Sequence, residues 1–130
     1  MKNLSRKIIP IGALALAGQI KAQEAPEEIA YNGEAGRIIN ENCVVCHREG
    51  GIGPMQFETY DQVRPWAPLI QLKVANREMP PYAYDHGIGI QQLQGDWRLE
   101  QAEIDTLVTW VNQGAPIGDP DSPLPTADLN

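Results

Sequence analysis

Apolar residues recur every three or four positions in three stretches of the chain, which is the spacing of helices packed through one face. The stretches cover residues 33–42, 65–77 and 101–113. A shorter helix is predicted over 59–64, with Thr59 as its N-cap. No convincing alternation of a strand and no internal repeat is visible. The pattern therefore predicts an all-α protein with three to five helices.

Prolines and glycines mark where two of these helices end. The run Met79-Pro80-Pro81 closes the 65–77 segment, because proline cannot continue a helix. Gly114 suits the left-handed position after the last helix, and Pro116 prevents its continuation. Between the two helices lies a long loop over 82–98, and loops of that length usually cover or bind something.

The two ends of the chain are predicted to lie outside the folded domain. Residues 1–22 look like a secretory signal peptide, with a basic start, a short apolar run and a small residue before the cleavage point. A membrane span needs about 20 apolar residues, so no stable anchor is expected. Residues 23–32 form a flexible acidic lead-in, and residues 118–130, rich in proline and aspartate, are predicted to be disordered. Residues 33–117 then form a single domain.

The charge of the chain limits its partners. It has 10 basic and 17 acidic residues, a net charge of −7 at neutral pH. Removal of the signal peptide takes away basic residues only, so the exported chain is more acidic still. Such a surface repels nucleic acid and anionic lipid and favours a partner with a basic docking patch. The alternative is that the charge only keeps the protein soluble.

The candidate chemistry lies in the run Cys43-Val44-Val45-Cys46-His47, which contains the only two cysteines of the chain. C-x-x-C-H is the pattern of covalent haem attachment. The spacing lets both thiols reach the vinyl groups of one porphyrin, and the next residue offers its imidazole to the iron. We therefore predict that Cys43 and Cys46 bind one haem c and that His47 ligates its iron. A haem would also complete a core that the composition makes thin.

Three other interpretations of the two cysteines are open. A thioredoxin-like redox pair would need a βαβ context, which the helical pattern does not offer. A zinc site would need four ligands, and the second histidine, His86, lies far along the chain in a glycine-rich segment. A disulfide across two residues would be unusual as the only bridge of a secreted domain.

The second axial ligand decides whether such a haem carries electrons or performs catalysis. Met79 is favoured, because it lies far enough from His47 to reach the opposite face and two prolines stiffen the backbone after it. Met55 lies too near His47, so core packing is its expected role. Ligation by His86 would give a bis-His haem, and a vacant position would suggest a peroxidase or a ligand sensor.

One further residue is a candidate for the haem site. Pro54 follows the glycine-rich residues 50–53, and its carbonyl is expected to accept a hydrogen bond from the second ring nitrogen of His47. A bond of this kind fixes the orientation of a metal-ligating imidazole and raises its basicity.

Taken together, these residues resemble the class I cytochrome c family, in which one haem has Met and His ligands. The Met-Pro-Pro motif is similar to that of a bacterial subgroup whose members often accompany other redox domains. The resemblance covers roughly residues 33–117. The matching positions are Ala35, Ile39, Cys43, Cys46, His47, Gly53, Pro54, Met79, Pro80 and Trp110.

The resemblance implies a cytochrome c fold, in which the first and last helices cross beside the haem. It also implies iron ligation by His47 and Met79 and a Pro54 carbonyl bonded to His47. Ala35 stands where the family usually has glycine, and the last helix follows Glu100 where Ser or Thr is common, which leaves its start less well capped. The expected function is single-electron transfer in the bacterial periplasm, without enzyme activity of its own. The alternatives are an electron-accepting subunit of a larger dehydrogenase and, less favoured, a haem peroxidase or ligand sensor.

Overall fold

The computed structural model describes residues 27–82, 87–89 and 96–128. The predicted signal peptide, residues 23–26 of the acidic lead-in and His86 lie outside these residues. Within them, no helix is long and apolar enough to cross a membrane.

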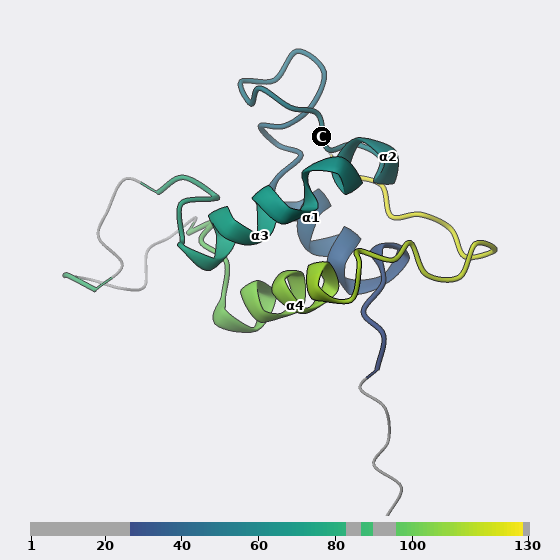
Figure 1. Cartoon of the computed structure of the whole chain (residues 1–130). Helices are drawn as coiled ribbons and strands as arrows, with labels where there is room; N and C mark the ends of the chain where they lie inside the picture. Colours follow the sequence, from purple (N-terminus) through teal and green to yellow (C-terminus); the bar gives the residue numbers. More distant parts are fainter. Residues whose placement is uncertain (1–26, 83–86, 90–95, 129–130) are drawn as a thin grey trace, which may run out of the picture.

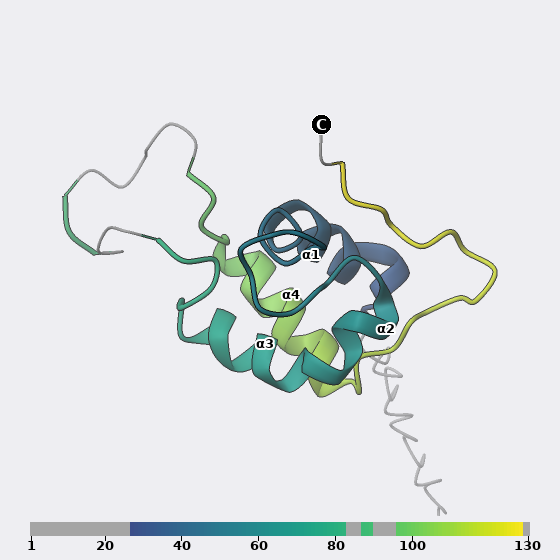
Figure 2. The same ribbon diagram turned by 90° about the horizontal axis from the view of Figure 1, so that it is seen from above.

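Helices make up the regular structure of the described residues, and no strand occurs among them. A π-helical turn, η1 (Tyr31–Ala35), kinked at Gly33, leads into α1 (Gly36–Asn42), and the last helix is α4 (Gln101–Asn112). Between them lie α2 (Tyr60–Val63), η2 (Arg64–Trp66) and α3 (Ala67–Ala75). Helix α4 contacts both α3 and η1, so the last helix connects the start of the domain with its middle (Figures 1 and 2). The predicted all-α class is confirmed.

The first helical segment begins before residue 33, inside the predicted lead-in. Tyr31 is fully buried, and its ring centroid lies 5.2 Å from that of Tyr60 and 6.2 Å from that of Trp110. The N–H of Ile29 donates to the Gln113 side chain over 2.9 Å. The buried Tyr31 ring and the Ile29 hydrogen bond thus attach the end of the lead-in to α4 and to the residue after it. The acidic composition of the lead-in does not predict this attachment.

The predicted helix over 65–77 is divided into η2 and α3. Pro65 and Pro68 each lack an N–H donor, so the hydrogen-bond pattern tightens and restarts there. Arg77 has a φ of 56°, which ends the helical path after Ala75. The predicted cap of α2 is confirmed: the Thr59 hydroxyl accepts from the N–H of Gln62, and the Gln62 side chain accepts from the N–H of Thr59.

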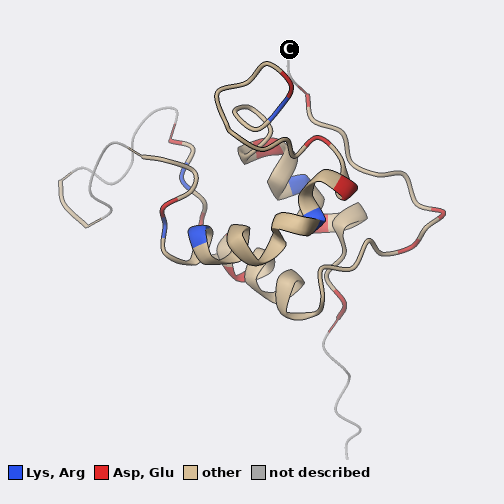
Figure 3. Cartoon of the chain, turned by 45° about the horizontal axis from the view of Figure 1, so that its top comes forward, with Lys and Arg blue, Asp and Glu red and all other residues tan. Residues whose placement is uncertain are grey.

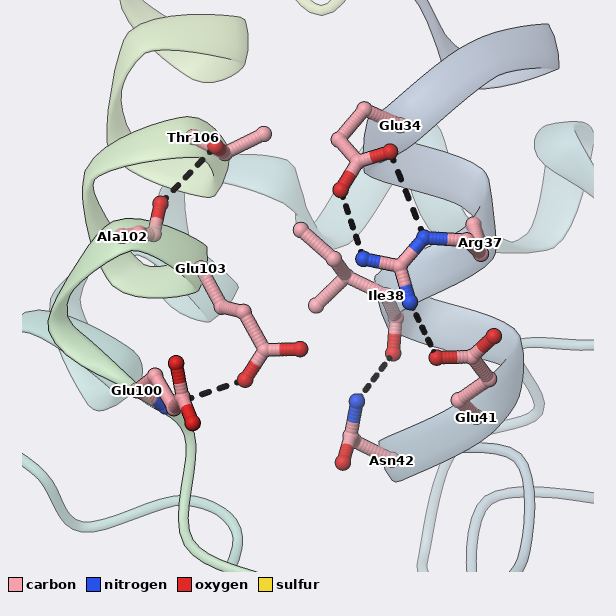
Figure 4. Close-up of polar contacts among 9 residues, drawn as sticks. All are labelled: Glu34, Arg37, Ile38, Glu41, Asn42, Glu100, Ala102, Glu103 and Thr106. Carbon is pink, nitrogen blue, oxygen red and sulfur yellow. Dashed lines mark hydrogen bonds and ion pairs between the residues drawn. The ribbon is translucent and has the colours of Figure 1, made fainter.

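Helix α4 matches its predicted range closely. Its inward face carries Ile104, Leu107 and Trp110, all of them buried. The expected weakness at its start is offset by Glu103, whose carboxylate accepts from the N–H of Glu100 over 2.9 Å (Figure 4). Gly114 has a φ of 93°, as predicted for the residue that terminates the helix.

The chain after α4 is bonded to η1 at its start, runs outward from the helices with most of residues 119–126 exposed, and returns to the edge of the core at Ala127 (Figure 1). The predicted disorder of residues 118–130 stays a prediction. The N–H groups of Tyr31 and Asn32 donate to the carbonyls of Pro116 and Ile117, each over 3.0 Å. Asn32 also donates from its side chain to the carbonyl of Asp119 over 2.5 Å. Backbone bonds to η1 therefore hold the start of a segment that composition marks as flexible (Figure 1).

One hydrophobic core joins all of these elements. It includes residues from α1, from the loop before α2, from α3 and from α4, and its largest fully buried side chain is that of Trp110. The indole N–H of Trp110 donates to the carbonyl of Pro116 over 2.9 Å, so the one polar atom of this ring is paired. The core residues are Tyr31, Ala35, Ile38, Ile39, Val44, Phe57, Val63, Ala67, Ile70, Val74, Leu99, Ile104, Leu107, Trp110 and Ala115.

Candidate functional site

The two cysteines and His47 form a compact turn directly after α1. The N–H of Cys43 donates to the carbonyl of Ile39 over 2.8 Å, which continues the helical pattern by one residue. The N–H groups of Cys46 and His47 then both donate to the carbonyl of Cys43, over 3.2 and 2.9 Å. Val44 is fully buried and anchors the turn in the core. The helix thus delivers both thiols and the imidazole within one tight turn, and neither cysteine is in a disulfide.

The imidazole of His47 is nearly buried and held in a defined orientation. Only 8% of the residue is exposed, and Nδ1 lies 3.1 Å from the carbonyl oxygen of Met55. When Nδ1 carries the proton and donates to this carbonyl, Nε2 keeps its lone pair and can bind a metal. The ring of Phe57 stacks on the imidazole, with centroids 4.5 Å apart and planes 23° apart.

The partner of the imidazole is Met55, and the expectation of a Pro54 carbonyl is corrected by one residue. The loop is fixed at two points: the N–H of Gly53 donates to the carbonyl of Cys46 over 2.8 Å, and that of Phe57 donates to the carbonyl of His47 over 2.8 Å. These bonds set the register that presents the Met55 carbonyl to the ring. The close approach needs glycine, because a Cβ at Gly53 would lie 2.5 Å from Nδ1.

Burial, followed by the nearby groups of Cys46 and Glu103, raises the pKa of the Cys43 thiol to about 12. The thiol is therefore protonated at neutral pH. A thiolate is the reactive form in thiol–disulfide exchange, and reactive cysteines have lowered pKa values. The surroundings of Cys43 are thus unlike those of a redox-active cysteine pair.

The side chains of the turn do not converge on one point. Among the described residues, no group of three or more Cys, His, Asp and Glu side chains is placed to hold a metal ion. A zinc ion bound by both thiolates and the imidazole would need such convergence. Covalent haem attachment does not, because the sulfurs bond carbon atoms and only the imidazole reaches the metal. The turn thus presents two thiols outside any disulfide and one oriented imidazole.

Met79 lies at the edge of the core, after α3. Its N–H donates to the carbonyl of Lys73 over 3.3 Å, and 38% of the residue is exposed. With Leu99 and Ile104, it lines a small cavity of about 10 Å³ near the start of α4. The residue is thus partly exposed, and its pairing with His47 across a haem stays a prediction.

Polar contacts that the sequence does not predict join the two ends of the 82–98 loop. We call the group formed by Tyr82, Asp96 and Arg98 the clamp. The Arg98 guanidinium lies 4.6 Å from the centre of the Tyr82 ring, and its Nε is 2.8 and 2.9 Å from the two carboxylate oxygens of Asp96. The indole N–H of Trp97 donates to the carbonyl of Pro81 over 3.0 Å. These contacts hold the chain just after Met79. No regular spacing predicts the Arg98–Tyr82 and Trp97–Pro81 contacts, since both join residues across a loop.

A cavity beside the turn has, among the described residues, no cluster of side chains that would give it separate binding chemistry. It has a volume of about 470 Å³ and lies between α1, Val45, Arg48 and residues 125–128. Arg37, on its wall, is already paired with Glu34 and Glu41 (Figure 4). Over the described residues, acidic side chains are spread across helices, loops and the segment after α4, with basic ones between them (Figure 3). No basic face that would suit nucleic acid stands out there.

Comparisons with protein-family models, with curated proteins and with solved structures found no match to this chain.

Proposed function

We propose that this protein is an exported single-electron carrier with one haem c, bonded to Cys43 and Cys46 and ligated by His47 and Met79. The observation that carries the proposal is the fixed imidazole. The residue that follows the second cysteine has its Nδ1 on a backbone carbonyl, which leaves Nε2 for iron. The five-residue sequence pattern supplies the attachment chemistry.

Each residue of the turn has one task in this proposal. The two thiols form the thioether bonds, and because both lie within one turn they fix the porphyrin relative to α1. His47 would hold the iron through its Nε2 lone pair, and the Met55 carbonyl keeps the imidazole in its orientation. Bound haem supplies an iron that gains and loses one electron. A ligand that is already oriented has little rearrangement to undergo in either oxidation state.

Met79 is proposed as the ligand on the opposite face. A thioether stabilises the reduced iron and raises the reduction potential. The clamp formed by Arg98, Asp96 and Tyr82 stiffens the segments beside it. A closed sixth position favours a carrier over a peroxidase or a ligand sensor.

The acidic surface suits a transient redox partner with a basic patch. Charged rims raise the association rate and are weakened by salt, so docking should be fast, weak and sensitive to ionic strength. The same surface would serve if the chain were the electron-accepting subunit of a dehydrogenase. Co-purification at low salt that is lost at high salt would favour the subunit.

Visible spectroscopy of two methionine variants tests the proposal. The chain is exported from a bacterium with haem-attachment machinery, and wild type, Met79→Ala and the control Met55→Ala are compared in both oxidation states. The oxidised wild type and the control are expected to show the weak sulfur-to-iron band, and Met79→Ala is expected to lack it. Met55→Ala keeps the carbonyl that faces His47. A band that persists in Met79→Ala would remove Met79 from the iron, and rapid carbon monoxide binding by the reduced wild type would favour a sensor or peroxidase.

A further inference from the structure

Phe57 stacks on the imidazole of His47, and the electron carrier proposed above gives it no role. The two rings lie 4.5 Å apart between centroids at an angle of 23°, and Phe57 is 4% exposed. The N–H of Phe57 donates to the carbonyl of His47 over 2.8 Å, so backbone and side chain both join the pair.

Three residues contact the imidazole: Phe57 lies on its face, and Met55 and Gly53 lie at its edge. The Met55 carbonyl meets the ring edge at Nδ1, and the backbone of Gly53 approaches the same edge closely. A hydrogen bond at one edge still lets the ring rock about its last torsion, which is broad for histidine. Contact across the flat face of the ring opposes this rotation, because a turned imidazole would collide with the benzene ring.

We propose that Phe57 is a positioning residue that fixes the rotation of the His47 ring plane relative to the porphyrin. The inference rests on the proposed function, since it concerns a haem ligand. The orientation of an axial imidazole determines how its π orbitals overlap with those of the iron, and contacts around a ligand tune the metal. With Phe57 in place, the imidazole would keep a single orientation, so the oxidised iron would have a single electronic state. Phe57 would thereby help to set the reduction potential.

The composition of the chain offers a direct probe, because Phe57 is its only phenylalanine. Incorporation of fluorine-labelled phenylalanine places a label at this position without a substitution. In the holo-protein, the fluorine resonance is expected to shift between the reduced and the oxidised states, since the ring packs on a ligand of the paramagnetic iron. The same resonance position in both states would overturn the proposal.

Two variants test the positioning role itself. Phe57→Leu removes the flat face, and Phe57→Tyr keeps it. With haem content equal to that of wild type, Phe57→Leu is expected to change the pattern of haem-methyl proton shifts in the oxidised protein and to shift the potential, while Phe57→Tyr restores both. Wild-type values in Phe57→Leu would overturn the inference and leave the haem proposal intact. If wild type contains no haem, the proposed function fails instead. If Phe57→Leu does not fold, an unchanged fluorine resonance between the two oxidation states would still overturn the inference, because the ring would then not pack on the iron ligand.

Discussion

Gly53 is the residue on which the geometry around His47 depends most directly. A Cβ at this position would lie 2.5 Å from Nδ1 of His47 and 2.9 Å from the carbonyl oxygen of Cys46. Both distances are too short for a methyl group, and one of the neighbours belongs to the backbone. The site therefore tolerates no side chain at Gly53 unless the loop or the imidazole moves.

We expect Gly53→Ala to lower the free energy of unfolding by about 1–3 kcal/mol, the usual cost of an overpacked site. Urea unfolding followed by tryptophan fluorescence measures it. Ile52→Ala is the matched control, because Ile52 is the preceding residue and 90% exposed. Equal stability of both variants would show that the glycine contact does not constrain the loop.

Tyr31 gives a prediction about pH. Burial, followed by the nearby Cys43, raises its pKa to about 12, and its hydroxyl is buried without a partner among the described residues. The folded state keeps the proton that the unfolded state loses near pH 10. The stabilisation is therefore complete below pH 10 and falls by up to about 3 kcal/mol as the pH rises towards 12.

Tyr31→Phe is expected to keep or raise stability at neutral pH and to flatten the decline above pH 10. Tyr60→Phe is the control, since the Tyr60 hydroxyl donates to the carbonyl of Ala115 over 2.8 Å and its loss should cost about 1 kcal/mol. Thermal unfolding at pH 7 and at several values above 10 compares them. An unchanged alkaline decline in Tyr31→Phe would contradict the assignment.

At this scale the sequence identifies some of the contacts and misses others. Cys43, Cys46 and His47 are evident from their spacing, and the structure brings them into one turn. The carbonyl that meets the imidazole is displaced from Pro54 to Met55, because two backbone hydrogen bonds set the register of the loop. The stacking of Phe57 has no sequence pattern, since it depends on how that loop folds back.

At the scale of elements, helix starts are predicted well where a side chain caps them. Thr59 caps α2 as predicted, although its reciprocal bond with Gln62 is seen only in the structure. Helix α4 begins and ends close to its predicted limits. The π-helical turn η1 is not foreseen, because it depends on burial of Tyr31 against α2 and α4. The break between η2 and α3 follows from Pro65 and Pro68. The spacing of apolar residues, on which the prediction of one continuous helix relied, does not show this break.

Thr59→Ala tests the α2 cap. Loss of the hydroxyl that accepts from Gln62 should cost about 1 kcal/mol of stability. Thr59→Ser keeps an acceptor and is expected to stay within a few tenths of a kcal/mol of wild type. Chemical unfolding of the three proteins decides, and equal losses in both variants would show that the methyl group of Thr59 matters more than its cap.

For the whole molecule, the helical class follows from periodicity, but the placement of distant segments does not. The residues directly after α4 are bonded to η1 through the carbonyls of Pro116, Ile117 and Asp119, contacts between distant segments that no local spacing predicts. Met79 lies near Leu99 and Ile104, an approach that no local spacing encodes. The central proposal is that one haem is bonded to the turn after α1 and contacts both this turn and Met79.

Mass spectrometry of a single tryptic peptide tests that claim most directly. Cleavage after Arg37 and Arg48 releases residues 38–48, which contain both cysteines and His47. For the chain exported from a bacterium with haem-attachment machinery, we predict that this peptide carries the mass of one haem and that neither thiol reacts with an alkylating reagent. The unmodified peptide with both cysteines alkylated would contradict the account.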